Sequence, residues 1–494
     1  MTIPVAEIDT NRQTDVAARL KRALPPDAVL HAAEDTRAYE CDGLSAYRQL
    51  PMVVALPEDE DQVRQVLGVC REMRVPVTAR GAGTGLSGGA LPRGDGVLLS
   101  LAKMRRIFAV DPVARTARVQ PGVTNLAISQ AAAPYRLFYA PDPSSQIACS
   151  IGGNVAENSG GVHCLKYGLT VHNVLRARAV TISGEIVEFG SEALDAPGLD
   201  LLALLVGSEG LLAVVTEVTV KLVPQPESAR VILASFGEVE KAGNAVADII
   251  AAGIIPAGLE MMDRPATRAV EDFVHAGYDL EAAALLLCEC DGTQAEVEGE
   301  IQRVSDVLKA AGATRLQVSE TEAERQLFWA GRKAAFPAVG RISPDYYCMD
   351  GTIPRRRLGE VLLFIGEMEK KYGLRCPNVF HAGDGNLHPL ILFDANEPDQ
   401  LRRTEEFAGE VLEKCVEVGG TITGEHGVGV EKINQMCVQF GKPEIAAFHA
   451  LKRAFDAEEL LNPGKNIPTL HRCAEFGRMH VRGGKLPHPE LPRF

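Results

Sequence analysis

Long apolar runs are missing from this chain, and its Lys and Arg residues are scattered. The apolar runs at 201–206 and 282–288 are far too short to span a bilayer. Residues 1–20 contain no apolar segment of the kind that marks a secretory signal. The net charge is −14, and because phosphate contacts need clustered cations, we expect no nucleic-acid partner and no direct membrane span.

The eleven cysteines have no regular spacing, and no C-x-x-C pair occurs. An iron–sulfur cluster needs a grouped set of cysteines, so none is expected in this chain. Cysteines without a regular spacing are also typical of reduced thiols in a cytosolic protein. We therefore expect a cytoplasmic location, with any membrane association made through partner subunits.

Glycine, by contrast, is concentrated in groups. The run Arg80-Gly81-Ala82-Gly83-Thr84-Gly85-Leu86-Ser87-Gly88-Gly89-Ala90 follows the short apolar segment 75–79 directly. Glycines with positive φ let successive N–H groups converge on an anion, and a glycine-rich loop after a strand is a common phosphate site. The alternative is a mobile loop.

The pattern G-x-G-x-x-G at 83–88 suggests a Rossmann site for NAD, but its surroundings argue against one. Residues 89–96 cannot start a helix, and no acid occurs near 103–108 to bind a ribose. We expect a phosphate-binding loop of a different kind.

Hydrophobic periodicity predicts two kinds of domain. A strand at 52–56, a helix after it and the strand that leads into the glycine loop form a β-α-β unit. Further elements of the first part are strands at 97–101, 116–120, 174–182, 185–189 and 213–222, and a helix at 125–133. After residue 226 we predict strands at 231–236, 257–262, 283–290 and 314–318, with helices at 238–252, 264–273, 293–311, 319–331, 402–417 and 443–457. The predicted boundaries are 1–226, 227–425 and 426–494.

Two more glycine motifs identify a family. The stretches Gly152-Gly153-Asn154-Val155-Ala156-Glu157-Asn158-Ser159-Gly160-Gly161 and Gly207-Ser208-Glu209-Gly210, together with the first loop, resemble the FAD-binding domain of vanillyl-alcohol-oxidase (PCMH) type flavoproteins. The resemblance covers about residues 48–226. It implies an α+β protein with this FAD-binding domain, an α+β cap or substrate domain, and a C-terminal segment that returns to the FAD domain.

The resemblance also implies a set of FAD-binding residues. Around the pyrophosphate these are Arg80, Gly81, Ala82, Gly83, Thr84, Gly85 and Gly88. Around the flavin and ribityl they are Pro141, Asp142, Ser145, Gly152, Gly153, Asn158 and Gly161. At the adenosine end they are Glu209, Gly210 and Val215, and the returning tail adds Asn462. Since residues 75–95 contain neither His nor Cys, we expect FAD to be bound non-covalently.

A possible metal site occurs in the second half of the chain. His381 and His388 lie in one glycine-flanked stretch and Glu425 in another, which makes a two-His-one-carboxylate set suited to Zn²⁺ or a similar divalent ion. A spacing of seven is not a helical pair, so such a site must be borne on loops. Hydrogen-bonded loop histidines are the alternative. These stretches resemble the metal site of flavin-dependent D-2-hydroxyglutarate and D-lactate dehydrogenases.

This resemblance implies a mechanism. A 2-hydroxy acid chelates the ion, which lowers the pKa of its hydroxyl. His426 takes the hydroxyl proton as general base and hydride passes to flavin N5; alternatively, His426 ligates the metal and water is the base. Arg332 stands where the relatives hold the substrate carboxylate, and the alternative is a surface arginine on a helix.

Two departures favour a short monoacid. Phe336 replaces a Thr of the hydroxyglutarate enzymes and Cys348 replaces a Lys, so a second carboxylate would be buried unpaired. Residues 344–355, 473–477 and 479–481 resemble the FAD-linked subunits of bacterial glycolate oxidases. That implies oxidation of glycolate to glyoxylate with D-lactate as a secondary substrate, and two partners, a second FAD-domain subunit and an iron–sulfur subunit. A stand-alone D-lactate or D-2-hydroxyglutarate dehydrogenase and a non-catalytic FAD-binding scaffold subunit are the alternatives.

Overall fold

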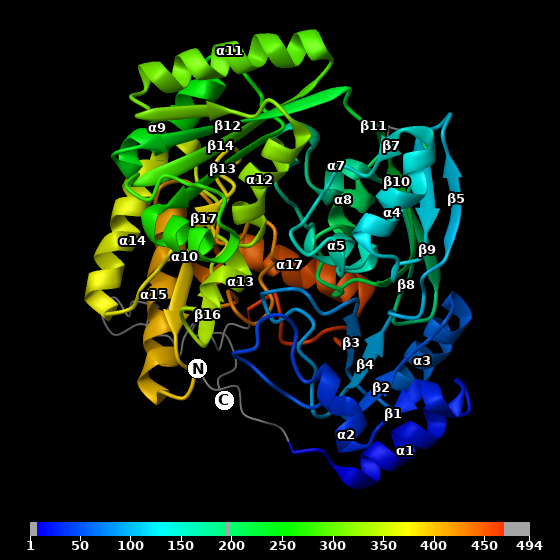
Figure 1. Cartoon of the computed structure of the whole chain (residues 1–494). Helices are drawn as coiled ribbons and strands as arrows, with labels where there is room; N and C mark the ends of the chain where they lie inside the picture. The colour runs from blue at the N-terminus through cyan, green and yellow to red at the C-terminus, as the bar shows by residue number, and fades with distance from the viewer. Residues whose placement is uncertain (1–6, 194–197, 469–494) are drawn as a thin grey trace.

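The computed structural model describes residues 7–193 and 198–468. Two main sheets lie between residues 29 and 221, and a third, five-stranded sheet with helices on both faces begins at residue 228 (Figure 1). This is the α+β architecture that the sequence predicts. The tail motifs at 473–477 and 479–481 lie outside the described residues.

The first sheet carries the predicted β-α-β unit. Its strands, in spatial order, are β1 (Val29–Leu30), β2 (Val53–Ala55), β4 (Val97–Ser100) and β3 (Val77–Arg80), and all but β1 run parallel. Helix α3 (Glu60–Glu72) links β2 to β3, and the Asp59 carboxylate caps it by accepting from the Gln62 N–H. Helix α1 (Thr10–Leu20) packs beside α3. The glycine loop starts where β3 ends, as predicted.

The second sheet is antiparallel. Its strands, in order, are β5 (Ile107–Asp111), β6 (Thr116–Val119), β10 (Val214–Lys221), β8 (Val174–Val180) and β9 (Ile186–Gly190). Three helices share its apolar core: α4 (Asn125–Ala132), α5 (Ile151–Glu157) and α8 (Leu201–Leu205). Helix α5 was not predicted, because paired glycines at 152 and 153 disfavour a helix. It forms with Ser150 as its N-cap and with Ile151 and Val155 buried against the sheet.

The third sheet is the centre of the predicted cap domain. Its strands, in order, are β15 (Arg315–Val318), β12 (Ser228–Phe236), β14 (Ala284–Gly292), β13 (Gly258–Asp263) and β17 (Val379–Phe380), and all pairs are antiparallel. Alternate residues of β12 face opposite sides, so Ile232 and Ala234 lie in one apolar core while Val231 and Leu233 lie in another. The sheet is therefore covered on both faces.

Each face of this sheet has its own helices. The first core includes α9 (Val239–Ala251), α11 (Gln294–Ala310), α14 (Leu358–Tyr372) and α15 (Pro398–Glu417). The second includes α10 (Arg264–Val274), α12 (Glu322–Lys333) and α13 (Ala335–Val339). Helix α14 was not among the predicted helices. A small sheet of β16 (Asp345–Cys348) and β18 (Leu390–Phe393) lies beside them.

The chain returns to the first sheet near its end. Helix α17 (Lys442–Phe455) crosses the middle of the molecule (Figure 1), and Leu461 then bridges to Val77 of β3. Leu460 and Leu461 are buried in the core of the first sheet. The buried ammonium of Lys452 donates to Leu211 O at 2.8 Å and to Leu461 O at 2.7 Å. The predicted return of the C-terminal segment is confirmed.

Two further expectations concern cysteines and membranes. Nine cysteines of the described part carry free thiols, whereas Cys437 is disulfide-bonded and departs from the expected reduced state. Among the described residues, we find no helix with the length and apolarity needed to cross a membrane.

Candidate active site

A single cavity joins the two halves of the chain. Its volume is about 370 Å³, within the range of small-molecule and cofactor sites. From the first half it is lined by the glycine loop and by residues of the second glycine motif. From the second half it is lined by His388, Glu425 and His426. Residues that lie more than 300 positions apart in the sequence therefore face one space.

The glycine loop presents unpaired donors to this cavity. Residues 82–86 all line it, and within the described part of the chain none of their N–H groups donates a hydrogen bond. A Cβ placed on Gly85 would project into open space. A run of free backbone N–H groups around a cavity is an anion-binding nest, so this loop fits the predicted pyrophosphate.

The predicted FAD-binding residues fall into two groups. Those that line the cavity are Gly81, Ala82, Gly83, Thr84, Gly85, Ser145, Gly153, Glu209 and Gly210. Those outside the lining are Arg80, Gly88, Pro141, Asp142, Gly152, Asn158, Gly161, Val215 and Asn462. Several of the second group hold the wall in place. Arg80 donates to Cys41 O, Asp142 pairs with His163, and Asn462 donates to Gly89 O and Glu209 O.

The loop that carries Glu425 and His426 is fixed directly to the FAD-side motifs. The Glu209 carboxylate accepts from the N–H groups of Val428 and Gly429, both at 2.7 Å. Ser87 O, in the glycine loop, accepts from the N–H groups of Val430 and Glu431 at 3.0 and 3.1 Å. Gly427 has φ +80°, and a Cβ there would collide with the Glu157 carboxylate, so only glycine fits.

The predicted metal ligands come together. The Oε1 atom of Glu425 lies 3.3 Å from Nε2 of His381 and 3.3 Å from Nε2 of His388. Both histidines are buried, and their ring centroids are 5.0 Å apart. Burial alone would raise the pKa of Glu425, but the hydrogen bonds of the two imidazoles outweigh it and hold that pKa well below its usual value.

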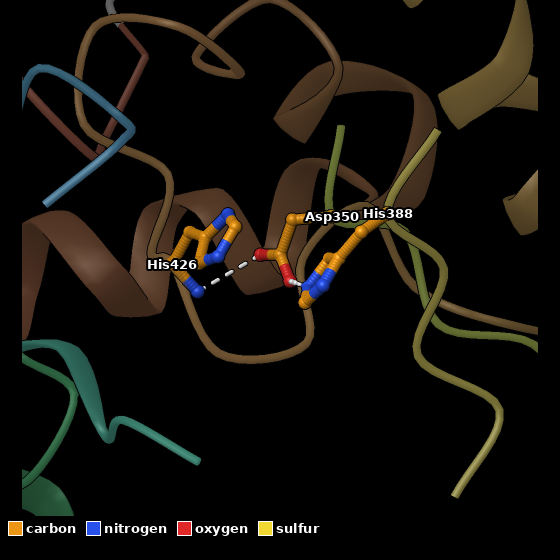
Figure 2. Close-up of side chains that lie close together, drawn as sticks. All are labelled: Asp350, His388 and His426. Carbon is orange, nitrogen blue, oxygen red and sulfur yellow. Dashed lines mark hydrogen bonds and ion pairs between the residues drawn. The ribbon is translucent and has the colours of Figure 1, made fainter. Parts of the chain in front are cut away.

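A second triad shares one of these histidines. Asp350, His388 and His426 also lie close enough to hold an ion, as Figure 2 shows. The Asp350 Oδ2 atom already accepts from Thr423 Oγ1, from the N–H groups of Gly424 and His426 and from Lys432 Nζ. Because its lone pairs are engaged by donors, Asp350 fixes the loop and is poorly suited as a ligand. Of the two sets, His381, His388 and Glu425 could better hold an ion.

His426 lies beside this set with a free nitrogen. Its ring stacks on His388 with centroids 4.8 Å apart, and its buried Nδ1 has no hydrogen-bond partner. Burial, with a contribution from nearby His388, lowers the pKa of His426 to about 4. The imidazole is therefore neutral near pH 7 and has a lone pair available to accept a proton.

Arg332 does not line the cavity, although the next residue, Lys333, does. Its Nε donates to Glu260 Oε2 at 2.7 Å, and its side chain is 4% exposed. Glu260 also contacts His381 Nδ1 at 2.8 Å through its other oxygen. The sequence reasoning missed Glu260 and the role of Asp350. A carboxylate within the predicted apolar strand 257–262 was the available signal, because a buried charge requires partners.

Replacing Asp350 tests whether it holds the Glu425–His426 loop. The D350N variant places an amide N–H₂ against several donors and leaves Lys432 without one of its two carboxylate partners. Breaking a buried ion pair costs about 3–5 kcal/mol, and we expect urea denaturation to show a loss of unfolding free energy of that order. The control is D345N, a partly exposed carboxylate at the start of β16, five residues before Asp350, which accepts one hydrogen bond from Ala395 N. Equal stabilities of D350N and wild type would contradict this role.

Comparisons with known proteins agree with this geometry. Residues 51–190 match the family model described as FAD binding domain, and residues 225–466 match that described as FAD linked oxidases, C-terminal domain. The solved structure of p-cresol methylhydroxylase superimposes with a TM-score of 0.79, covering 94% of this chain and 98% of that one at 17% identity. This likeness confirms the PCMH-type fold.

Two relatives match nearly the whole chain. The glycolate oxidase subunit GlcD of Escherichia coli K12 is 65% identical over 482 residues, which cover 98% of this chain and 97% of the relative. The D-lactate dehydrogenase of Anaerostipes hadrus is 32% identical over 471 residues, or 93% and 99% of the two chains. With its glycine-lined cavity and its two matched domains, the chain belongs to the FAD-linked oxidase family that includes the glycolate oxidase subunits GlcD.

Proposed function

We propose that this chain oxidises a short 2-hydroxy acid, principally glycolate to glyoxylate with D-lactate as a secondary substrate, and that FAD takes up the electrons. One observation carries the proposal: the cavity lined by the free N–H groups of residues 82–86 is also lined by His388, Glu425 and His426. A dinucleotide on the glycine loop and a substrate beside the histidines would therefore share one space. The names of the relatives support the substrate class.

The FAD-side residues named above would hold the dinucleotide without a covalent bond. FAD, when bound, supplies a two-electron acceptor for the hydride that leaves the substrate carbon. The glycine loop contributes donors to the pyrophosphate, while Ser145, Gly153 and Gly210 shape the wall. Apart from Leu86, residues 81–90 have small side chains or none, so the backbone can approach the cofactor closely.

His381, His388 and Glu425 would hold a divalent ion, with Zn²⁺ as the proposed species. The three potential ligand atoms lie within 4.8 Å of one another, and His388 Nε2 faces both Glu425 Oε1 at 3.3 Å and Asp350 Oδ1 at 3.6 Å. Two imidazoles and a carboxylate suit Zn²⁺ and leave a position open. Such an ion supplies Lewis acidity toward the substrate hydroxyl.

The remaining side chains have positional and acid–base roles. His426, neutral and with an unpartnered Nδ1, accepts the hydroxyl proton, so the substrate loses one proton to this ring and one hydride from C2. Arg332 stays the proposed partner of the substrate carboxylate, as the sequence predicts: it directly precedes the cavity-lining Lys333, and its Nε donates to Glu260.

The wall beside His388 limits substrate size. Phe336 lines the cavity, and its ring packs against the ring of Tyr346 in a tilted arrangement, with centroids 5.7 Å apart. Both pack on an apolar cluster that contains Cys348 and Leu390. Lys333 also lines the cavity, but its side chain is exposed. A second carboxylate placed against the apolar cluster itself would lose its hydration, which disfavours a diacid such as D-2-hydroxyglutarate.

We further propose that electrons leave through partner subunits. The glycolate oxidase relatives are named as subunits, which supports an assembly of several chains. A second FAD-domain subunit and an iron–sulfur subunit are the proposed partners, in the cytoplasm or at a membrane that those partners reach. A scaffold that only binds FAD is the second candidate, but the pairing of His381, His388 and Glu425 around one point favours chemistry.

Steady-state rates on three acids test the proposal. We expect kcat/KM to fall in the order glycolate, D-lactate and D-2-hydroxyglutarate, because the apolar wall rejects a second carboxylate. An artificial electron acceptor removes the dependence on partner subunits. Fastest turnover of D-2-hydroxyglutarate would contradict the assignment, and no turnover of any of the three by FAD-loaded protein would favour the scaffold.

The F336A variant tests the wall itself. Removing the ring leaves room for the methyl group of D-lactate, so the kcat/KM ratio of D-lactate to glycolate should rise about tenfold. F336L, which keeps most of the apolar bulk, is the control and should stay near the wild-type ratio. An unchanged ratio in F336A would show that Phe336 does not bound the substrate.

A further inference from the structure

Glu260 is a fully buried carboxylate that touches both a metal-ligand candidate and the arginine of the site. It lies on strand β13, with one oxygen 2.8 Å from His381 Nδ1 and the other 2.7 Å from Arg332 Nε. Its partners come from separate segments, the loop after β17 and the last turn of α12. One rigid carboxylate therefore fixes the distance between the two.

The neighbours of Glu260 strengthen this link. Leu259 O accepts from Gly383 N at 2.8 Å, and Met261 pairs with Phe380 in the sheet. Both flanking residues of Glu260 are thus bonded to the segment that carries His381. This backbone clamp means that Glu260 cannot move relative to the imidazole without breaking the edge of the sheet.

We propose that Glu260 is a positioning residue that orients His381 for metal binding and aligns Arg332 with it, so that the two ends of a 2-hydroxy acid are recognised together. The inference rests on the proposed function. Because Nδ1 faces a carboxylate, it carries the ring proton, which leaves the Nε2 lone pair directed at the cluster with Glu425. Arg332, bonded through Nε, is held at one orientation.

Replacing Glu260 by glutamine removes the negative charge of the side chain and keeps its shape. Glu260 now accepts from two donors, one through each oxygen. In E260Q one of those donors must face an N–H₂ group, so either His381 or Arg332 loses its partner while the side-chain volume stays nearly the same. Outer carboxylate partners of ligating histidines contribute about 10–100-fold to metal affinity.

The experiment measures Zn²⁺ affinity of the FAD-loaded full-length protein by competition with a chromophoric chelator, and separately the kcat and KM for glycolate. We expect E260Q to bind Zn²⁺ about 10–100-fold more weakly and to show a raised glycolate KM when Zn²⁺ is saturating. The matched control is D263N, a buried carboxylate on the same strand that accepts from Ala266 N and Asn378 and touches neither His381 nor Arg332. It should leave Zn²⁺ affinity unchanged.

The possible outcomes distinguish failure of the role of Glu260 from failure of the proposed function. Wild-type protein that oxidises glycolate, with an E260Q variant equal to it in Zn²⁺ affinity and KM, would overturn the role of Glu260 alone. Equal weakening in E260Q and D263N would reduce Glu260 to a structural residue and would also overturn it. Wild-type protein that neither binds Zn²⁺ nor oxidises glycolate would overturn the proposed function together with this inference.

Discussion

The site depends on one buried carboxylate that joins distant parts of the chain. Glu209, from the third glycine motif, accepts backbone N–H groups of Val428 and Gly429 and the side-chain amide of Asn466. These bonds hold the loop with Glu425 and His426 against the glycine loop, whose Ser87 O accepts from the next two residues. These bonds help to fix the two linings of the cavity relative to each other, so that a cofactor on one would face a substrate on the other.

Buried charge is balanced on both sides of that cavity. Glu425 lies between two imidazoles, Glu260 lies between His381 and Arg332, and Asp350 lies beside Lys432 and three backbone N–H groups. Carboxylates this deeply buried are tolerated only when they are paired and hydrogen-bonded. The same arrangement directs Nε2 of His381 and of His388 at Glu425, where a metal is proposed, and leaves His426 Nδ1 without a hydrogen-bond partner, where proton transfer is proposed.

The spacing of apolar residues along the chain predicted most of the helices and strands, because the elements around the site follow the usual helical and strand periodicities. The helix from Glu60 shows its apolar face every three to four residues, and the strands of the third sheet are continuous apolar runs. Helix α5 escaped prediction since Gly152 and Gly153 disfavour helix locally and burial of Ile151 and Val155 overrides them. In the site, the loop-borne spacing of His381 and His388 was informative. The contact of Glu260 with Arg332, 72 residues away, is a product of packing that no local pattern encodes.

The central claim is that electron transfer requires the glycine-lined half and the histidine-lined half of one cavity together. Anaerobic addition of glycolate to FAD-loaded protein, followed by visible absorbance of the flavin before and after removal of metal by a chelator, tests it most directly. The account predicts bleaching of the metal-containing protein and none after chelation, with FAD still bound and bleaching restored by Zn²⁺. Equal bleaching of protein shown to be free of metal, or none in either state, would contradict it.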